Sequence, residues 1–163
     1  NKKVLKSVDP RRIIATMVKL RAELYERPYD PQTFIDGLYQ TYSGIIRQQN
    51  GIPGSSVPIQ QFYLAHVLSL QSKSFFHNME KVKFREYTAD QFAVDLWRYF
   101  ESDIESTSDG HVLKLRPGRN DSLWLFDSQG ERRRITAISF QEKENDIKRT
   151  IGTFETFSGQ NYY

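Results

Sequence analysis

The spacing of apolar residues changes near position 110, and this change constrains the fold more than any other feature of the sequence. Up to residue 105, apolar residues recur every three or four positions, the spacing of a helix face that packs on a core. Between 111 and 140 they alternate with other residues, as in a strand with one buried side. Turn-forming residues at 106–110 separate the two patterns. The sequence therefore predicts an α+β fold, with helices within 10–105 and a sheet within 111–140.

Four helices are expected to form an N-terminal bundle. Asp-Pro pairs at 9–10 and 30–31 mark two helix starts, because Asp accepts free backbone N–H groups and Pro has none to leave unpaired. Thr88 and Gln91 match a capping box at a third start. Residues 71–87 are expected to be an irregular connector. The predicted helices cover residues 10–25, 31–49, 58–70 and 88–105.

Three strands are expected in the second pattern, at residues 111–115, 122–126 and 133–140. The sequence Asp-Ser-Gln-Gly at 127–130 is typical of a tight turn. It predicts that the last two strands form a C-terminal β-hairpin within a three-stranded antiparallel sheet.

The organisation of the chain predicts one α+β domain over residues 9–140. We expect residues 1–8 to be a linker from an upstream region, and 141–163 to be a polar and aromatic tail. The chain opens with Asn rather than Met and shows no apolar region of the signal-peptide type, so we expect a module of a larger cytoplasmic protein. No apolar run reaches the ~18–20 residues of a membrane span, so no membrane partner is expected.

Composition excludes several kinds of chemistry. The chain has no Cys and only three His, at the scattered positions 66, 77 and 111, so no metal and no cofactor is expected. Gly-x-Ser-x-Gly, the pattern of a nucleophile elbow, does not occur in the sequence. These absences make a non-catalytic module more plausible than an enzyme.

A basic segment is the main functional signal. The net charge is only +3, but residues 110–140 carry six Lys and Arg against three Asp and Glu. A row of cations binds nucleic acid by displacing the counterions of its phosphates. The order of helices, a short strand and a hairpin resembles a winged helix, in which the hairpin would be the wing. The candidate phosphate-binding residues are Lys114, Arg116, Arg119, Arg132, Arg133 and Arg134.

Two observations set limits on this interpretation. Three arginines leaving a turn are also what a solvated strand end carries, where charge discourages edge-to-edge aggregation. The helix predicted at 88–105 is acidic, so it would repel phosphates in a major groove. Base reading would then fall to the uncharged helix at 58–70, with Gln60, Gln61 and the nearby Gln71. The sequence therefore favours contacts with the nucleic-acid backbone.

A metal-dependent nuclease is the enzymatic alternative. Asp121 precedes a predicted hairpin, and an apolar strand then leads to Gln-Glu-Lys at 141–143, an arrangement that resembles the PD-(D/E)xK class. The resemblance implies that Asp121 binds a divalent cation and that Lys143 polarises the attacking water. Gln141 stands where the class has an acidic residue, and it is a weaker ligand for a hard cation.

A protein–protein assembly domain is the third possibility. An apolar hairpin and an aromatic tail suit a domain whose partners are other domains or subunits of the parent protein. Trp124 alternates with Leu123 and Leu125, so both sides of this strand carry apolar residues.

Overall fold

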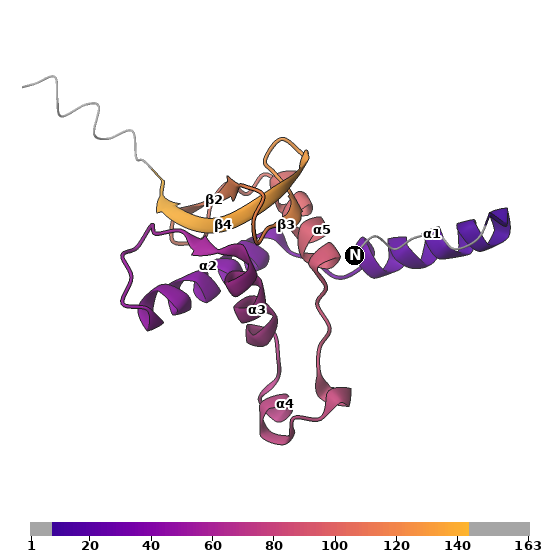
Figure 1. Cartoon of the computed structure of the whole chain (residues 1–163), viewed down its shortest axis with the longest axis horizontal. Coiled ribbons are helices and arrows are strands. Elements are labelled where there is room, and N and C mark those ends of the chain that lie inside the picture. The colour runs from indigo at the N-terminus through magenta and orange to yellow at the C-terminus, as the bar shows by residue number, and fades with distance from the viewer. Residues whose placement is uncertain (1–7, 144–163) are drawn as a thin grey trace, which may run out of the picture.

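The structure is a computed structural model, and it describes residues 8–143. It confirms the α+β class: five α-helices and a 3₁₀ helix accompany a four-stranded antiparallel sheet in this part of the chain (Figure 1). The winged-helix resemblance stays a prediction. The helices are α1 (Pro10–Leu24), α2 (Pro31–Gln48), α3 (Ile59–Ser69), α4 (Lys73–Asn78), η1 (Lys81–Lys83) and α5 (Ala89–Phe100). The strands are β1 (Val57–Pro58), β2 (His111–Pro117), β3 (Leu123–Phe126) and β4 (Arg132–Glu142).

The predicted helix starts are confirmed by their capping hydrogen bonds. Asp9 accepts a hydrogen bond from the backbone N–H of Arg11 at 3.0 Å, and Asp30 accepts one from that of Thr33 at 2.7 Å. Thr88 opens α5 with both halves of the capping box present. These caps supply acceptors for first-turn N–H groups, which have no partner inside a helix.

β4 organises the sheet because every other strand pairs with it. The predicted hairpin of β3 and β4 is confirmed, and β2 pairs along the remaining length of β4. Ile135 is the register partner of both Pro117 in β2 and Leu123 in β3, so these two strands lie on opposite edges of β4.

The core lies between this sheet and the helices α2, α3 and α5, which cover one side of it (Figure 1). Apolar side chains of the sheet point to that side, while the other side of the sheet faces away from the helices. The largest fully buried side chains are Phe62, Phe92, Phe140, Ile35, Leu38, Ile59, Leu96, Leu125, Ile135, Ile138 and Val57.

The sheet differs from the prediction in two respects. The short strand β1 was not predicted, because two residues show no periodicity and Pro58 lacks an N–H for a ladder. It pairs with β4 through Val57 and Ile138, and gives the sheet a fourth strand. β4 continues to Glu142, two residues into the predicted tail. Residues 144–163 of that tail, and residues 1–7 of the predicted linker, lie outside the described residues.

The helices also differ from the predicted bundle. The connector 71–87 contains α4 and η1, which project from the core on a long loop, and α5 ends at Phe100 rather than near 105 (Figure 1). α1 extends away from the sheet and the other helices, and none of its described residues is buried. The sequence predicted that α1 is amphipathic, but it did not show that its apolar stripe remains exposed.

A buried ion pair links the segment 25–30, between α1 and α2, to α5. Arg27 lies 2.8 Å from the carboxylate of Asp95, whose side chain is only 6 % exposed. Tyr87 donates a second hydrogen bond to that carboxylate at 2.8 Å, and Tyr29 donates to the Asp95 backbone carbonyl. Charge burial of this kind is tolerated when the carboxylate has partners on several sides.

Candidate nucleic-acid interface

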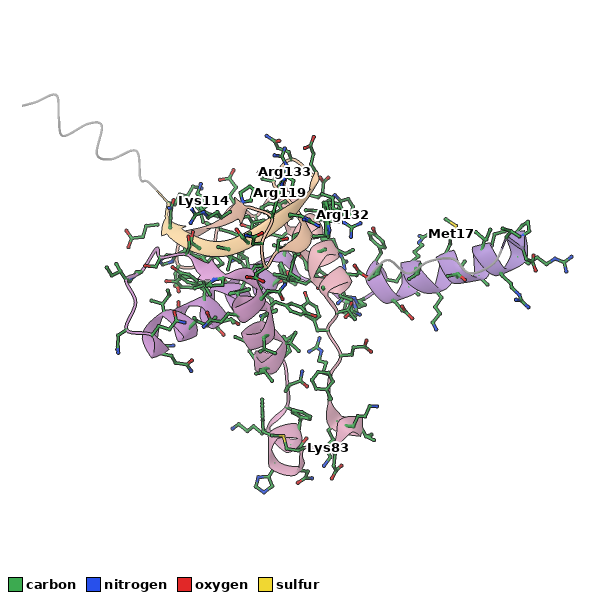
Figure 2. All side chains as sticks on the ribbon, viewed as in Figure 1. Met17, Lys83, Lys114, Arg119, Arg132 and Arg133 are labelled. Atoms are coloured by element: carbon green, nitrogen blue, oxygen red, sulfur yellow. The ribbon has the colours of Figure 1, made fainter. Side chains whose placement is uncertain are left out.

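The candidate interface is the side of the sheet that faces away from the helices. In β2, Leu113 and Leu115 oppose the core residues Phe140 and Ile138, so the alternate residues Lys114 and Arg116 point outward. Both of these cations are exposed. Figure 2 shows Lys114, Arg119 and Arg132 in the upper part of the view, where the sheet lies.

A β-bulge in β4 determines which of its residues share this outer side of the sheet. Ile135 and Ile138 are both fully buried, although residues three apart on a regular strand would point to opposite sides. The register shifts between Arg116 and Pro117, which gives β4 one extra residue in this region. As a result Arg134 and Arg132 lie on the same side as Lys114 and Arg116.

Trp124 is the aromatic component of this face. It pairs with Arg134 across the β3–β4 ladder, and its side chain is 50 % exposed. The guanidinium carbon of Arg134 lies 5.2 Å from the centre of the Trp124 ring, and that of Arg132 lies 5.6 Å from it. These are cation–π distances, so both arginines are held beside the ring while they remain exposed to solvent.

Arg133, the third arginine of the row, has different surroundings. It pairs with Leu125, which is fully buried, and so belongs to the opposite side of the ladder. Its Nε lies 2.6 Å from Asp127, and one of its terminal nitrogens lies 2.7 Å from Glu131. The row of three arginines is therefore divided. Arg132 and Arg134 have no carboxylate partner among the described residues, whereas Arg133 is neutralised by two carboxylates of the β3–β4 turn.

We define the sheet cations as Lys114, Arg116, Arg119, Arg132 and Arg134. Within residues 8–143, none of the five takes part in a salt bridge. Seven positions of β4 separate Arg132 from Ser139, the partner of Lys114, so the cations cover roughly 23 Å of sheet at about 3.3 Å per residue. This length suits several consecutive phosphates of a nucleic acid.

Arg119 lies in the loop between β2 and β3, and it is exposed. Gly118 begins that loop and donates its backbone N–H to the Arg134 carbonyl at 3.0 Å. A Cβ atom on Gly118 would lie 2.5 Å from Thr136 Cγ2, so only glycine allows the loop to approach the sheet this closely.

The helices offer little for reading bases. Asp95 of α5 is buried in the ion pair with Arg27, and Arg98 donates to the Arg27 carbonyl at 3.3 Å. Gln71 is buried and bonded to backbone atoms of Val67 and Arg85. Asp95 and Arg98, two charged residues of the acidic helix α5, therefore hold the chain at Arg27.

Gln60, Gln61 and His66, the remaining polar residues considered on α3, do not form one polar surface, because His66 is buried while the two glutamines are exposed. Gln60 donates to the Ser122 carbonyl at 3.4 Å, while Gln61 is exposed on α3. His66 is buried beside Thr41. Burial lowers the pKa of His66 to about 4, so its imidazole is neutral near pH 7 and provides no cation for phosphate.

The two residues of the nuclease alternative lie far apart. Asp121 stands in the loop before β3, two positions from Leu123, the partner of Ile135. Lys143 follows Ile135 by eight positions, roughly 26 Å along β4. Lys143 is bonded to Glu105 at 2.8 Å, and this hydrogen bond holds the pKa of that carboxyl below its ordinary value. The described residues contain no cluster of three metal-ligating side chains either.

Comparisons with family models, with curated proteins and with solved structures gave no match to this chain. Within residues 8–143, every helix is too short or too polar to cross a membrane.

Proposed function

We propose that this chain is a non-catalytic nucleic-acid-binding module of a larger intracellular protein, and that it contacts phosphates through the outer side of its sheet. The observation that carries the proposal is the arrangement of the sheet cations: four exposed Lys and Arg side chains lie on one side of one sheet, and the exposed Arg119 lies in the loop between two of its strands. Phosphate contacts made by exposed cations fix a protein on nucleic acid without reading its sequence.

Three features of the geometry support this proposal. The bulge in β4 places Arg132 and Arg134 on the side of Lys114 and Arg116, so four cations share one side of the sheet. The carboxylates of the neighbouring turn, Asp127 and Glu131, are engaged with Arg133 and leave that surface to the cations. The cations also stand on a sheet that is held by a packed core, so binding costs little entropy for ordering the backbone.

A salt titration tests the proposal. Fluorescence anisotropy would measure the dissociation constant for a labelled duplex and a labelled single strand at several salt concentrations. If the five sheet cations contact phosphates, the slope of log K against log salt is expected between about −3.5 for the single strand and about −4.5 for the duplex, because each contact contributes about −0.7 to −0.9. A slope near zero, or no binding at low salt, would contradict the proposal.

Self-assembly through α1 is a second candidate function, favoured by a separate observation. Ile14, Met17 and Val18 form an apolar stripe on α1, and each is about 60 % exposed. α1 extends away from the core over 15 residues, and an isolated helix of this length has marginal stability in water. We infer that a second copy of this chain covers the stripe.

The macrodipole of α1 favours an antiparallel arrangement of the two copies, because antiparallel helices oppose their dipoles favourably. Glu23 and Glu26, at and just after the end of the helix, are paired with Lys19 and Arg21 of the same chain. Side-chain charges therefore do not set the direction of the pairing.

The mass in solution tests self-assembly. Sedimentation equilibrium is expected to show a dimer for the unmodified chain and a monomer for Met17→Glu, which places a charge in the stripe. Thr16→Glu makes the same change of charge on the opposite side of α1 and should remain dimeric. A monomeric unmodified chain would exclude this second function and leave the first untouched.

A further inference from the structure

Trp124 has an environment that phosphate binding alone does not require. An exposed tryptophan between two arginines is a group that can stack with another flat ring, and its own two neighbours are cations that attract polyanions. The protein keeps half of this side chain exposed on the outer side of a sheet whose other side buries Leu125 completely. We infer that Trp124, Arg132 and Arg134 form a stacking site for an unpaired base, so that the ligand of this face is single-stranded nucleic acid.

The inference rests on the proposed function and specifies its ligand. In a duplex the faces of the bases are covered by their neighbours, so an aromatic side chain on a sheet cannot reach them. In a single strand the bases are free to stack on aromatic rings and on guanidinium planes, while the phosphates follow a positively charged surface. The three residues supply both types of contact within one cross-strand group.

The geometry of the ladder keeps these three side chains together. Trp124 and Arg134 are direct register partners, and Arg132 lies two residues before Arg134 on the same strand. Side chains at such direct and diagonal positions of an antiparallel pair lie within reach of one another. Arg133 points to the other side and is held by Asp127, so it does not compete for the ring.

Chain composition permits a direct spectroscopic test. The protein has two tryptophans, and the second, Trp97, is half-buried on α5 with its ring centre 6.1 Å from that of Tyr25. In a Trp97→Phe variant, which keeps an aromatic ring at that position, the tryptophan fluorescence comes from Trp124 alone. A base that stacks on Trp124 should quench this fluorescence.

The experiment compares two probes of equal length and charge. The first is an oligothymidylate of about ten nucleotides, and the second is the same phosphodiester chain without bases. We expect oligothymidylate to bind between fivefold and 100-fold more tightly, since stacking is worth about 1–3 kcal/mol per base, and to quench Trp124. The Trp124→Leu variant should remove the preference while it retains the salt dependence.

The outcomes distinguish the inference from the function on which it rests. Equal affinity for the two probes, without quenching, would overturn the stacking site and leave phosphate binding in place. Tighter binding of a duplex than of the single strand would likewise overturn it. Failure of both probes to bind at low salt would overturn the proposed function and the stacking site together. The comparison of probes on the Trp97→Phe protein holds even if Trp124→Leu folds poorly.

Discussion

Arg133 is bound to Asp127, with 2.6 Å between the guanidinium Nε and the carboxylate Oδ2, and this contact divides the row of three arginines. Arg132 and Arg134 remain on the outer side of the sheet beside Trp124. The same row therefore contains two candidate phosphate ligands and one residue that stabilises the turn between β3 and β4.

This division predicts unequal effects within the row. The double variant Arg132→Ala/Arg134→Ala should weaken binding to single-stranded DNA and reduce the size of the salt slope by about 1.4, because two phosphate contacts are lost. Arg133→Ala should change the slope little, since its charge is already neutralised. Lys83→Ala removes a cation far from the sheet (Figure 2) and serves as a control. Equal slopes for all of these proteins would contradict the assignment.

The buried ion pair predicts a large loss of stability when one partner is removed. Arg27→Ala should lower the free energy of unfolding by about 3 kcal/mol, because it leaves the Asp95 carboxylate buried without its cation. Arg21→Ala breaks an exposed pair with Glu26 and should cost less than about 1 kcal/mol. Urea denaturation of the two variants checks this, and similar midpoints would show that the buried pair contributes nothing special.

Burial of His66 predicts a dependence of stability on pH. Its pKa is lowered to about 4 in the folded chain, while the unfolded chain has the ordinary value near 6.5. The unfolded state therefore binds more protons between these values. The contribution of neutral His66 to the free energy of unfolding is therefore fully present above pH 6.5. It should fall by about 3 kcal/mol as the pH drops to 4.

A variant isolates the contribution of His66 from that of the carboxyl groups. His66→Gln should have a smaller loss of stability between pH 7 and pH 4.5 than the unmodified chain, because the neutral amide does not titrate in this range. Denaturation midpoints of both proteins at the two pH values provide the measurement. Parallel pH profiles would show that His66 does not carry this effect.

The contact of Gly118 with Thr136 predicts a steric effect. Gly118→Ala should destabilise the fold by about 1–3 kcal/mol, because its Cβ would overlap Thr136 Cγ2. Thr136→Ser removes that methyl group and should restore part of the loss. Gly44→Ala, within α2 and with open space around its Cβ, should instead stabilise by about 0.5–1 kcal/mol. Thermal melts check the three changes, and a harmless Gly118→Ala would contradict the close packing.

Local patterns in the sequence predicted much of the fold. The caps at Asp9, Asp30 and Thr88 form as expected, since capping depends on residues within one turn of each other. The β3–β4 hairpin also follows from its turn sequence. β1 could not be predicted, because two residues carry no period and their pairing with Ile138 brings together distant parts of the chain.

The candidate site was predicted in composition and only partly in arrangement. The sequence selected all five sheet cations, and it also selected Arg133, although alternation along a strand already separates Arg133 from Arg132 and Arg134. The contact of Trp124 with the two arginines could not be predicted, because it depends on the register of β3 against β4. Asp121 and Lys143 belonged to one motif resemblance that would bring them to a common site, and the length of β4 keeps them apart.

The sequence alone determined the four longer helices, the three longer strands, the capped helix starts and which cations are available, because those properties depend on neighbours along the chain. Only the tertiary structure decided which side of the sheet each cation occupies, that Asp127 neutralises Arg133, and that α1 leaves its apolar stripe exposed. These features depend on strand register, on a single extra residue in β4 and on contacts between distant segments, all of which are fixed when the chain packs.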